Sequence, residues 1–178
     1  AKTAAGAYAD PFYEGLRLAM EAVLGGIDRF IVQAKRRLAD EALAGATTGR
    51  LAKEIAALTR LRTGRPETAY DMLLFVWLYF FYSEHMDGIQ CRSLTELDVF
   101  VTPYYEADLA AGRTTEAEFR EQLRHFFWQW GSISNYWNQP VGLGGTNADG
   151  TSAFNRVSAI ILDELDARPE VKSTMGLA

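Results

Sequence analysis

The sequence predicts a mainly α-helical protein with one or two short strands. In the N-terminal part, apolar residues recur at the three-to-four-residue spacing of a helix, at Leu16, Met20, Val23, Ile27, Ile31, Ala34 and Leu38. A second stripe at the same spacing consists of Phe119, Leu123, Phe126, Phe127 and Trp130. The stretch "VGLGGTNADGT" fits a short strand or loop followed by a glycine-rich turn.

Composition indicates a globular chain with a sizeable core. Of its 178 residues, 48% are hydrophobic and 12% aromatic. A net charge of -5 argues against docking on nucleic acid or on an anionic membrane. Residues 1–10 lack the apolar core of a signal peptide, and one cysteine suits a reducing compartment, so we expect a cytoplasmic protein. The longest apolar run, Met72–Tyr82, is too short to span a bilayer.

The N-terminal third predicts two helices. The first extends from Phe12 to about Leu43, and we expect Gly25 and Gly26 to weaken or bend its middle. Small residues at 44–49 break the pattern. The second helix follows, with one face formed by Leu51, Ile55 and Leu58.

The middle of the chain predicts two more helices. "RTGRPE" is a turn, and Pro66 suits the first turn of the helix that contains Met72–Tyr82, which is apolar on every side and therefore expected to be buried. Another helix is expected after Pro103, continuing through Leu109 and ending near Gly112.

The C-terminal third predicts two helices with clear start signals. "TEAE" at Thr115–Glu118 fits a capping box, in which a hydroxyl and a carboxylate bind free amides at a helix start. The aromatic stripe follows and is expected to face the core, with Gln129 facing away. We expect a last helix whose core-facing side chains are Phe154, Val157, Ile161 and Leu165.

Several stretches resemble metal-binding or phosphate-binding motifs but lack residues that those motifs require. His85 and His125 lack a glutamate three positions earlier, so the di-iron pattern is absent, and we expect no metal site. "GLGGTN" resembles a phosphate-binding loop, but Asn147 stands where a third glycine belongs. "GTNADG" resembles a calcium loop, yet its first and twelfth positions would be Gly145 and Arg156 instead of carboxylates.

The chain's one cysteine and its acidic residues need separate interpretation. Arg92 beside Cys91 would favour a thiolate, but no histidine is placed by sequence to act as its base, so we interpret Cys91 as a small, partly buried residue. Asp98, Glu106 and Asp108 would be the candidates for paired carboxylates. Glu106 and Asp108 point apart on a helix, so a solvated face is the default expectation.

Two longer stretches, "LDVFVTPYYEADLAAGRTTEAEFREQL" and "LGGTNADGTSAFNRVSAIILDELD", together resemble the pyruvate formate-lyase-like domain of glycyl radical enzymes. The family pattern places an aspartate at Asp98, a Pro-hydrophobic-Tyr group, an Asp-Leu pair and a Gly-x-x-Thr helix start in that order. It continues with a Gly-Gly pair, an Asp-Gly turn and an Asn-x-x-Ser helix, here Asn155 to Ser158. Upstream, "FYEGLRLAMEAV" and "PETAYDMLLFVWL" are similar to two helices that precede this run in the family.

The sequence also departs from the family. The family's Gly-Arg pair is Thr95-Glu96 here, and its glutamine after the aspartate is Val99. Family members are several times longer, and their catalytic cysteine and radical glycine follow the Asn-x-x-Ser helix. "RVSA" is a near miss for the radical motif, because Ala159 stands in place of the glycine.

The resemblance implies a segment from the N-terminal half of a glycyl-radical α/β barrel, belonging to an anaerobic lyase or dehydratase for a small polar substrate. We expect a flexible N-terminus at 1–11, the family segment at 12–166 and a C-terminal tail at 167–178. The resemblance makes Arg92 and Ser93 candidate substrate-binding residues: Arg92 for a carboxylate and Ser93 for an oxygen. Surface exposure of both is the alternative.

The resemblance also implies partners. These are a small-molecule substrate, a radical-generating activase, and either a homo-oligomer or the remainder of the barrel. No catalytic residue, metal or cofactor is expected in this chain, although the full-length family carries a glycyl radical. A non-catalytic helical interaction or scaffold module is the alternative function.

Overall fold

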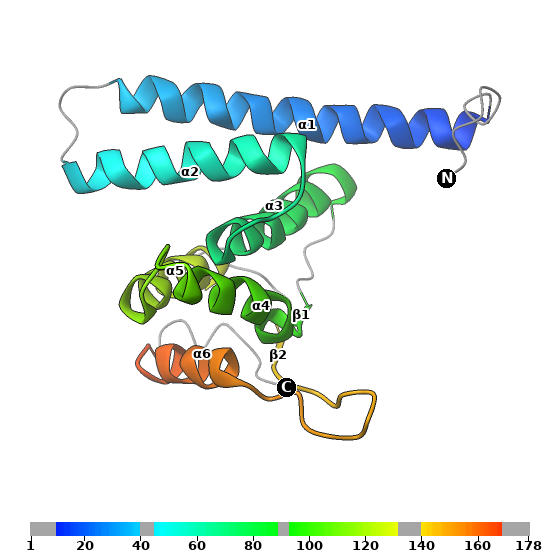
Figure 1. Ribbon diagram of the computed structural model, residues 1–178. Helices are drawn as coiled ribbons and strands as arrows, with labels where there is room; N and C mark the ends of the chain where they lie inside the picture. The colour runs from blue at the N-terminus through cyan, green and yellow to red at the C-terminus, as the bar shows by residue number, and fades with distance from the viewer. Residues whose placement is uncertain (1–9, 40–44, 89–92, 132–139, 169–178) are drawn as a thin grey trace. The chain divides into compact units, whose positions relative to one another are not determined.

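The computed structural model describes residues 10–39, 45–88, 93–131 and 140–168. The chain divides into two compact units, Ala1–Arg65 and Pro66–Ala178 (Figure 1). The boundary lies in the "RTGRPE" turn. Most of the expected flexible N-terminus and most of the expected C-terminal tail lie outside the described residues.

The first unit is a hairpin of two antiparallel helices, α1 (Pro11–Leu38) and α2 (Gly45–Thr63) (Figure 1). Asp10 caps α1, since its side chain accepts the amide hydrogen of the residue two positions on, at 2.9 Å. The helix α1 continues unbroken through Gly25 and Gly26.

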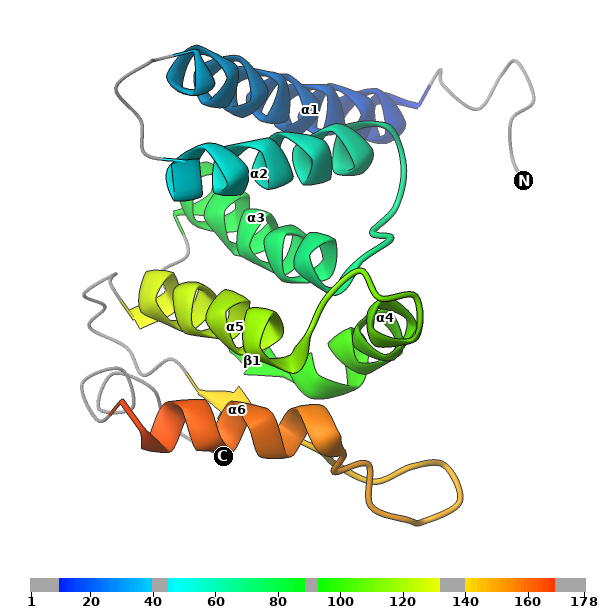
Figure 2. The same cartoon turned by 60° about the vertical axis from the view of Figure 1, so that its left-hand side comes forward.

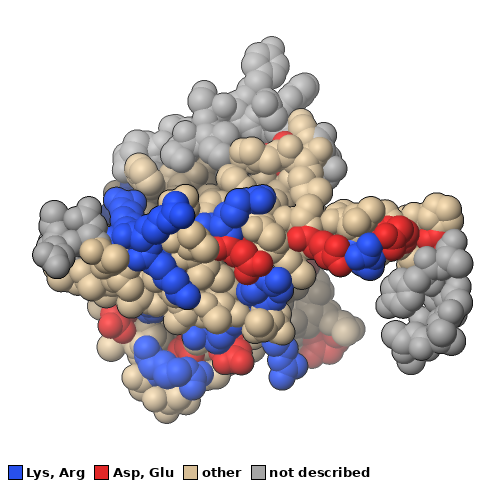
Figure 3. Space-filling model, turned by 90° about the horizontal axis from the view of Figure 1, so that it is seen from above, with Lys and Arg blue, Asp and Glu red and all other residues tan. Residues whose placement is uncertain are grey.

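The two helices of the hairpin overlap over only part of their length. Buried residues of this unit include Ile27, Ala34, Leu51, Ala57, Leu58 and Leu61. Arg62, near the end of α2, binds Asp28 of α1 at 2.9 Å, so the part of α1 before Asp28 extends past the end of α2. Leu16 and Met20, the first two residues of the apolar pattern in this helix, lie in that part and are exposed. Figure 3 shows Lys and Arg gathered over the other half of α1, which ends in Lys35, Arg36 and Arg37.

The second unit begins with α3 (Ala69–Asp87), whose start was placed too early from the sequence. Thr68, and not Pro66, determines where the helix begins. Its hydroxyl accepts from the amide of Asp71 at 3.1 Å, and the Asp71 carboxylate accepts from the amide of Thr68 at 3.2 Å. This is a capping box in which aspartate takes the usual place of glutamate.

The apolar run Met72–Tyr82 is helical, as predicted, but only part of its surface is buried. Leu73 and Val76 lie in the core, whereas Phe75 and Tyr79 are exposed. No helix within the described residues is long and apolar enough to cross a membrane.

Next along the chain, β1 (Leu94–Thr95) leads into α4 (Leu97–Ala110). The helix was expected only after Pro103, and that boundary is wrong. A proline inside a helix removes one hydrogen bond and costs about 3 kcal/mol, but the helix still forms because its face with Leu97 and Val101 is completely buried.

The remaining elements are α5 (Glu116–Gly131), β2 (Val141–Gly142) and α6 (Arg156–Asp166), which together with α3 and α4 surround a shared core (Figure 2). β1 and β2 are parallel, with Leu94 opposite Val141. The capping box at the start of α5 is confirmed: the amide of Thr115 donates to the Glu118 carboxylate at 2.9 Å, and the amide of Glu118 donates to the Thr115 hydroxyl at 3.2 Å.

The predicted aromatic stripe of α5 is also confirmed, since all five of its residues are buried. Gln129, expected to face away, is half-buried instead. On α6, Val157, Ile161 and Leu165 are buried as predicted, but Phe154 is exposed because it precedes the helix and so does not follow its periodicity.

An ion-pair network joins α5 to α6. The largely buried carboxylate of Glu164 accepts from Arg124 at 2.7 Å and from Arg120 at 3.1 Å. Burial raises the pKa of Glu164, but the hydrogen bonds from the two arginines outweigh it, so the pKa is lowered.

We expect Phe127→Ala to destabilise the protein by about 3–5 kcal/mol, because it leaves a cavity in the core. The matched control is Trp128→Ala, which removes an adjacent but exposed aromatic ring and should change stability by no more than about 0.5 kcal/mol. Urea unfolding monitored by circular dichroism measures both. Equal losses would show that the helix phasing is wrong.

We expect Glu164→Gln to destabilise the protein by about 1–3 kcal/mol at neutral pH, since two arginines lose a charged partner. A lowered pKa means that this stabilisation is present above the ordinary glutamate value of 4.5 and is lost as the pH falls through the lowered pKa. The stabilities of Glu164→Gln and the unmodified protein should therefore converge in acid. A difference that stays constant down to acidic pH would contradict this role.

Candidate functional site

A completely buried polar group in the second unit is the carboxylate of Asp98. It lies in the first turn of α4 and has an exposed fraction of 0%. Its Oδ2 accepts from the backbone amide of Gly144 at 2.8 Å and from the hydroxyl of Ser158. Asp98 therefore joins α4 to the segment after β2 and to the start of α6. We call these contacts the Asp98 clamp.

The start of α6 is held to α4 by a second group of contacts. Asn155 caps α6: its side-chain oxygen accepts the amides of Val157 and Ser158 at 2.8 and 3.2 Å. The same oxygen accepts from the hydroxyl of Thr102 on α4 at 3.0 Å. The amide of Asn155 donates in turn to the Ser158 hydroxyl at 2.8 Å, which orients that hydroxyl toward Asp98.

The clamp requires a residue without a side chain at Gly144. Gly144 has a positive φ of 74°, and a Cβ there would meet the backbone nitrogen of Phe154 at 3.3 Å. The chain then turns through an exposed loop, in which Asn147 binds Thr151 and the Thr146–Ser152 bridge closes the turn.

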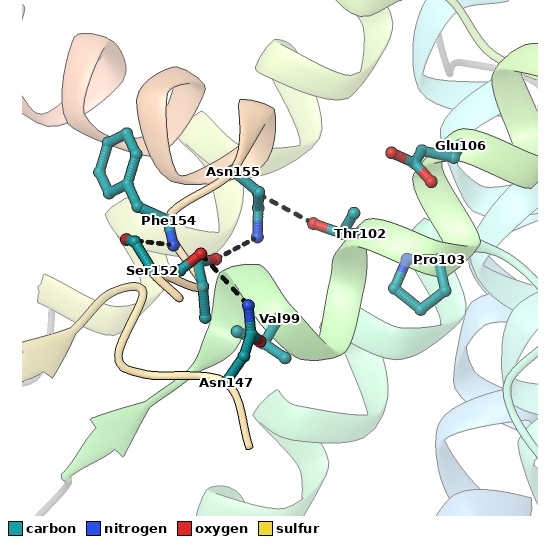
Figure 4. A pocket seen from close by; sticks show the side chains of 9 residues that line it. Val99, Thr102, Pro103, Glu106, Asn147, Ser152, Phe154 and Asn155 are labelled. Carbon is teal, nitrogen blue, oxygen red and sulfur yellow. Dashed lines mark hydrogen bonds between the residues drawn. The ribbon is translucent and has the colours of Figure 1, made fainter. Parts of the chain in front are cut away.

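A hollow of about 330 Å³ lies between α4 and this loop (Figure 4). It is lined by Val99, Thr102, Pro103, Glu106, Asn147, Ser152, Ala153, Phe154 and Asn155. Its hydroxyl and amide groups could hold a small polar molecule. No histidine, cysteine or lysine is among these lining residues, and Glu106 is the ionisable side chain among them.

Asp108 is a second carboxylate that is buried, contrary to the expected solvated face. It is buried and accepts from the amide of Ala69 at 2.8 Å and from Arg113 at 2.7 Å, so it stabilises the start of α3. The expected solvated face holds for Glu106, which is exposed, but is wrong for Asp98 and Asp108.

A signal for both carboxylates was present in the sequence. Asp98, Val101, Tyr105 and Asp108 are spaced by three or four residues and therefore share one face of α4, which is buried. This shared spacing with Val101 and Tyr105 indicates burial of both carboxylates.

Ser93, one of the two predicted substrate-binding residues, does not line the hollow. Ser93 is exposed and immediately precedes β1, whereas the segments that line the hollow follow the two strands. Arg92 and Cys91 lie outside the described residues. Within the described part of the chain, no three His, Cys, Asp or Glu side chains are grouped so that they could hold a metal ion.

Comparison with known families gives one match. The sequence model of the pyruvate formate lyase-like family matches residues 2–173. No curated protein matches the chain.

Comparison with solved structures supports the same fold. A glycyl radical enzyme from Archaeoglobus fulgidus matches with a TM-score of 0.72 and 21% identity over 83% of this chain. The glycerol-bound B12-independent glycerol dehydratase from Clostridium butyricum matches with a TM-score of 0.71 and 19% identity over 85% of the chain.

A third structure is hydroxyproline dehydratase from Clostridioides difficile with trans-4-hydroxy-L-proline bound, with a TM-score of 0.68 and 21% identity over 82% of this chain. In each case the match covers only 20% of the other chain. The predicted fold class, a mainly helical segment of the glycyl radical enzyme fold, is thereby confirmed.

We expect Ser158→Ala to destabilise the protein by about 1–3 kcal/mol, because the buried Asp98 carboxylate loses a donor that water cannot replace. Ser152→Ala is the matched control. The Ser152 hydroxyl also accepts a backbone amide, that of Phe154 at 3.2 Å, but it is exposed to water, so its loss should cost no more than about 0.5 kcal/mol. Urea unfolding compares the two, and an equal cost would show that the clamp contributes little.

Proposed function

Because the chain belongs to the pyruvate formate lyase-like family, we propose that it forms part of a glycyl-radical-type lyase or dehydratase that acts on a small polar substrate. Two proteins of similar structure were solved with glycerol or trans-4-hydroxy-L-proline bound, and both ligands are small and hydroxylated. The chain spans about a fifth of the length of these proteins, so the activity proposed belongs to a larger assembly.

The chain's own contribution is to hold a strand pair and its connections in place. The observation that carries this proposal is the Asp98 clamp, which binds the exit of β2 at Gly144 while Asp98 itself follows β1 by three residues. Two parallel strands of a barrel are thereby fixed in register at one point, together with α6. Such rigid support is what a substrate site on neighbouring segments requires.

The glycyl radical of the family does not fit the residues of this chain. In full-length members it supplies hydrogen abstraction by way of a cysteine thiyl. The nearest sequence here, Arg156 to Ala159, has alanine at the glycine position and forms the first turn of α6, where Val157 and Ser158 are buried. The radical and the site for a radical-generating activase would therefore lie outside the described residues.

Substrate contacts are proposed at Arg92 and Ser93, the residues just before β1. An arginine can bind a carboxylate through two parallel hydrogen bonds, and a serine can donate to a substrate oxygen. The exposure of Ser93 leaves its hydroxyl available for such a contact.

A non-catalytic scaffold module is the alternative, and one observation favours it. Glu96 stands where the family has an arginine, and it adopts a left-handed conformation with φ of 59°, which is unusual for a residue other than glycine. Sequencing the surrounding reading frame distinguishes the two functions. A downstream cysteine and an Arg-Val-x-Gly-aromatic motif in the same frame would support the lyase, and an intact frame without them would support the scaffold.

We expect the chain alone to form no glycyl radical. The measurement is an electron paramagnetic resonance spectrum after anaerobic incubation with a glycyl-radical activase, S-adenosylmethionine and reductant. A full-length glycyl radical enzyme treated with its activase serves as the positive control and should show the glycyl doublet. The chain and its Cys91→Ser variant should both be silent. A stable carbon-centred radical on this chain would contradict the proposal.

A further inference from the structure

The face of α1 opposite its packed side carries an ordered charge pattern. Ile27 and Ala34 are buried and define the packed side. On the opposite side, residues spaced by three or four form one continuous stripe: Glu14, Leu18, Glu21, Gly25, Arg29, Val32 and Arg36. We call this set the α1 stripe. Its apolar members are exposed, Leu18 to 53% and Val32 to 47%.

The α1 stripe is antisymmetric in charge about Gly25. The half before Gly25 has an apolar residue between two acidic ones, and the half after it has an apolar residue between two basic ones. Reading outward from Gly25 in either direction gives the same spacing: a charge four positions away, an apolar residue at seven and a charge at eleven. Such a pattern is complementary to its own antiparallel copy.

The basic half of the α1 stripe consists of exposed arginines. No ion pair to Arg29 or Arg36 is found among the described residues, and both are exposed. In the second unit, by contrast, Arg113, Arg120, Arg124 and Arg156 all bind carboxylates. Together with Asp28, Val32 and Gln33, the two arginines line a shallow hollow on α1.

The carboxylates in the acidic half of the α1 stripe can accept further hydrogen bonds. Arg17 binds both Glu14 and Glu21, which fixes the two carboxylates on the helix surface. The hydrogen bond from Arg17 keeps the pKa of Glu14 below its usual range, so Glu14 is charged at neutral pH. An ionised carboxylate has about four acceptor sites, so each can also accept a hydrogen bond from a second arginine.

From this pattern we propose that the α1 stripe is the contact surface for a second copy of the chain, arranged antiparallel about a two-fold axis at Gly25. In this register Glu14 meets the partner's Arg36, Leu18 meets the partner's Val32, and Glu21 meets the partner's Arg29. The two-fold axis generates each contact twice. The paired stripe extends about 33 Å along the helix at 1.5 Å per residue.

Gly25 explains how the two helices approach each other at the axis. No heavy atom lies within 4 Å of the position where its Cβ would be, so the glycine opens the surface without serving any contact inside its own unit. Small residues let helix backbones come close at a crossing point. The stripe is unsuited to nucleic acid, because its acidic half and the net charge of -5 would repel phosphates.

The test is the oligomeric state of the whole chain, measured by sedimentation equilibrium at salt concentrations from about 0.05 to 0.5 M. We expect a monomer–dimer equilibrium that weakens as salt rises. The double variant Arg29→Glu/Arg36→Glu should raise the dimer dissociation constant by at least about tenfold, because it places like charges opposite each other. Arg50→Glu/Arg65→Glu is the control, with the same change in net charge at exposed residues outside the stripe, and should dimerise like the unmodified chain.

A charge-swapped pair makes the test specific for the register. Glu14→Lys/Glu21→Lys carries only basic charges on the stripe, and Arg29→Glu/Arg36→Glu carries only acidic ones. Each should be monomeric alone, and their equal mixture should form a heterodimer. Circular dichroism confirms that both variants keep their helix content.

Three outcomes would overturn the proposal. One is a chain that stays monomeric at all concentrations and salt levels. Another is a dimer that persists in both charge variants. The third is a salt-insensitive dimer abolished by Leu16→Glu/Met20→Glu, which would place the contact on the opposite, apolar side of α1.

Discussion

The burial of the Asp98 carboxylate constrains how three segments of the second unit are arranged. A charged group without exposed surface is costly unless donors surround it. Here two donors from other segments, at Gly144 and Ser158, bind Oδ2 of Asp98, whereas its buried Oδ1 has no hydrogen-bond partner among the described residues. The positions of α4, the β2 exit and α6 are therefore interdependent: shifting one of them removes a donor from a buried charge.

Local features of the sequence follow from this constraint. A Cβ at position 144 would lie only 3.3 Å from the backbone nitrogen of Phe154, and the positive φ of 74° also favours glycine there. Ser158 must lie three residues after the cap of α6, because its hydroxyl accepts the amide of Asn155 while it donates to Asp98. The Gly-Gly pair and the Asn-x-x-Ser helix that first suggested the family are thus parts of one hydrogen-bonded structure.

The sequence predicted the apolar packing of this unit better than its polar packing. The aromatic stripe and the Thr115 capping box depend on neighbours within one helix turn, and both were found. The burial of Asp98 and Asp108 depends on donors from residues 46 positions later and 39 positions earlier, which local patterns cannot supply. The predicted start of α4 was wrong for a related reason. The tertiary burial of Leu97 and Val101 outweighs the free-energy cost of placing Pro103 inside the helix.

In the hairpin of the first unit, unlike in the second unit, part of a helix lacks tertiary packing. Because α2 ends opposite Asp28, the first part of α1 is a helix without a partner in its own unit, and helices in water owe most of their stability to packing. The ion pairs from Arg17 to Glu14 and Glu21 add only a few tenths of a kcal/mol each. The part of α1 before Asp28 therefore has little stabilisation from its own unit. Any surface that covers its apolar side or its charged side would stabilise it. The charged side has the more specific pattern, because an apolar stripe fits many surfaces, whereas alternating acidic and basic halves fit only a surface of matching order.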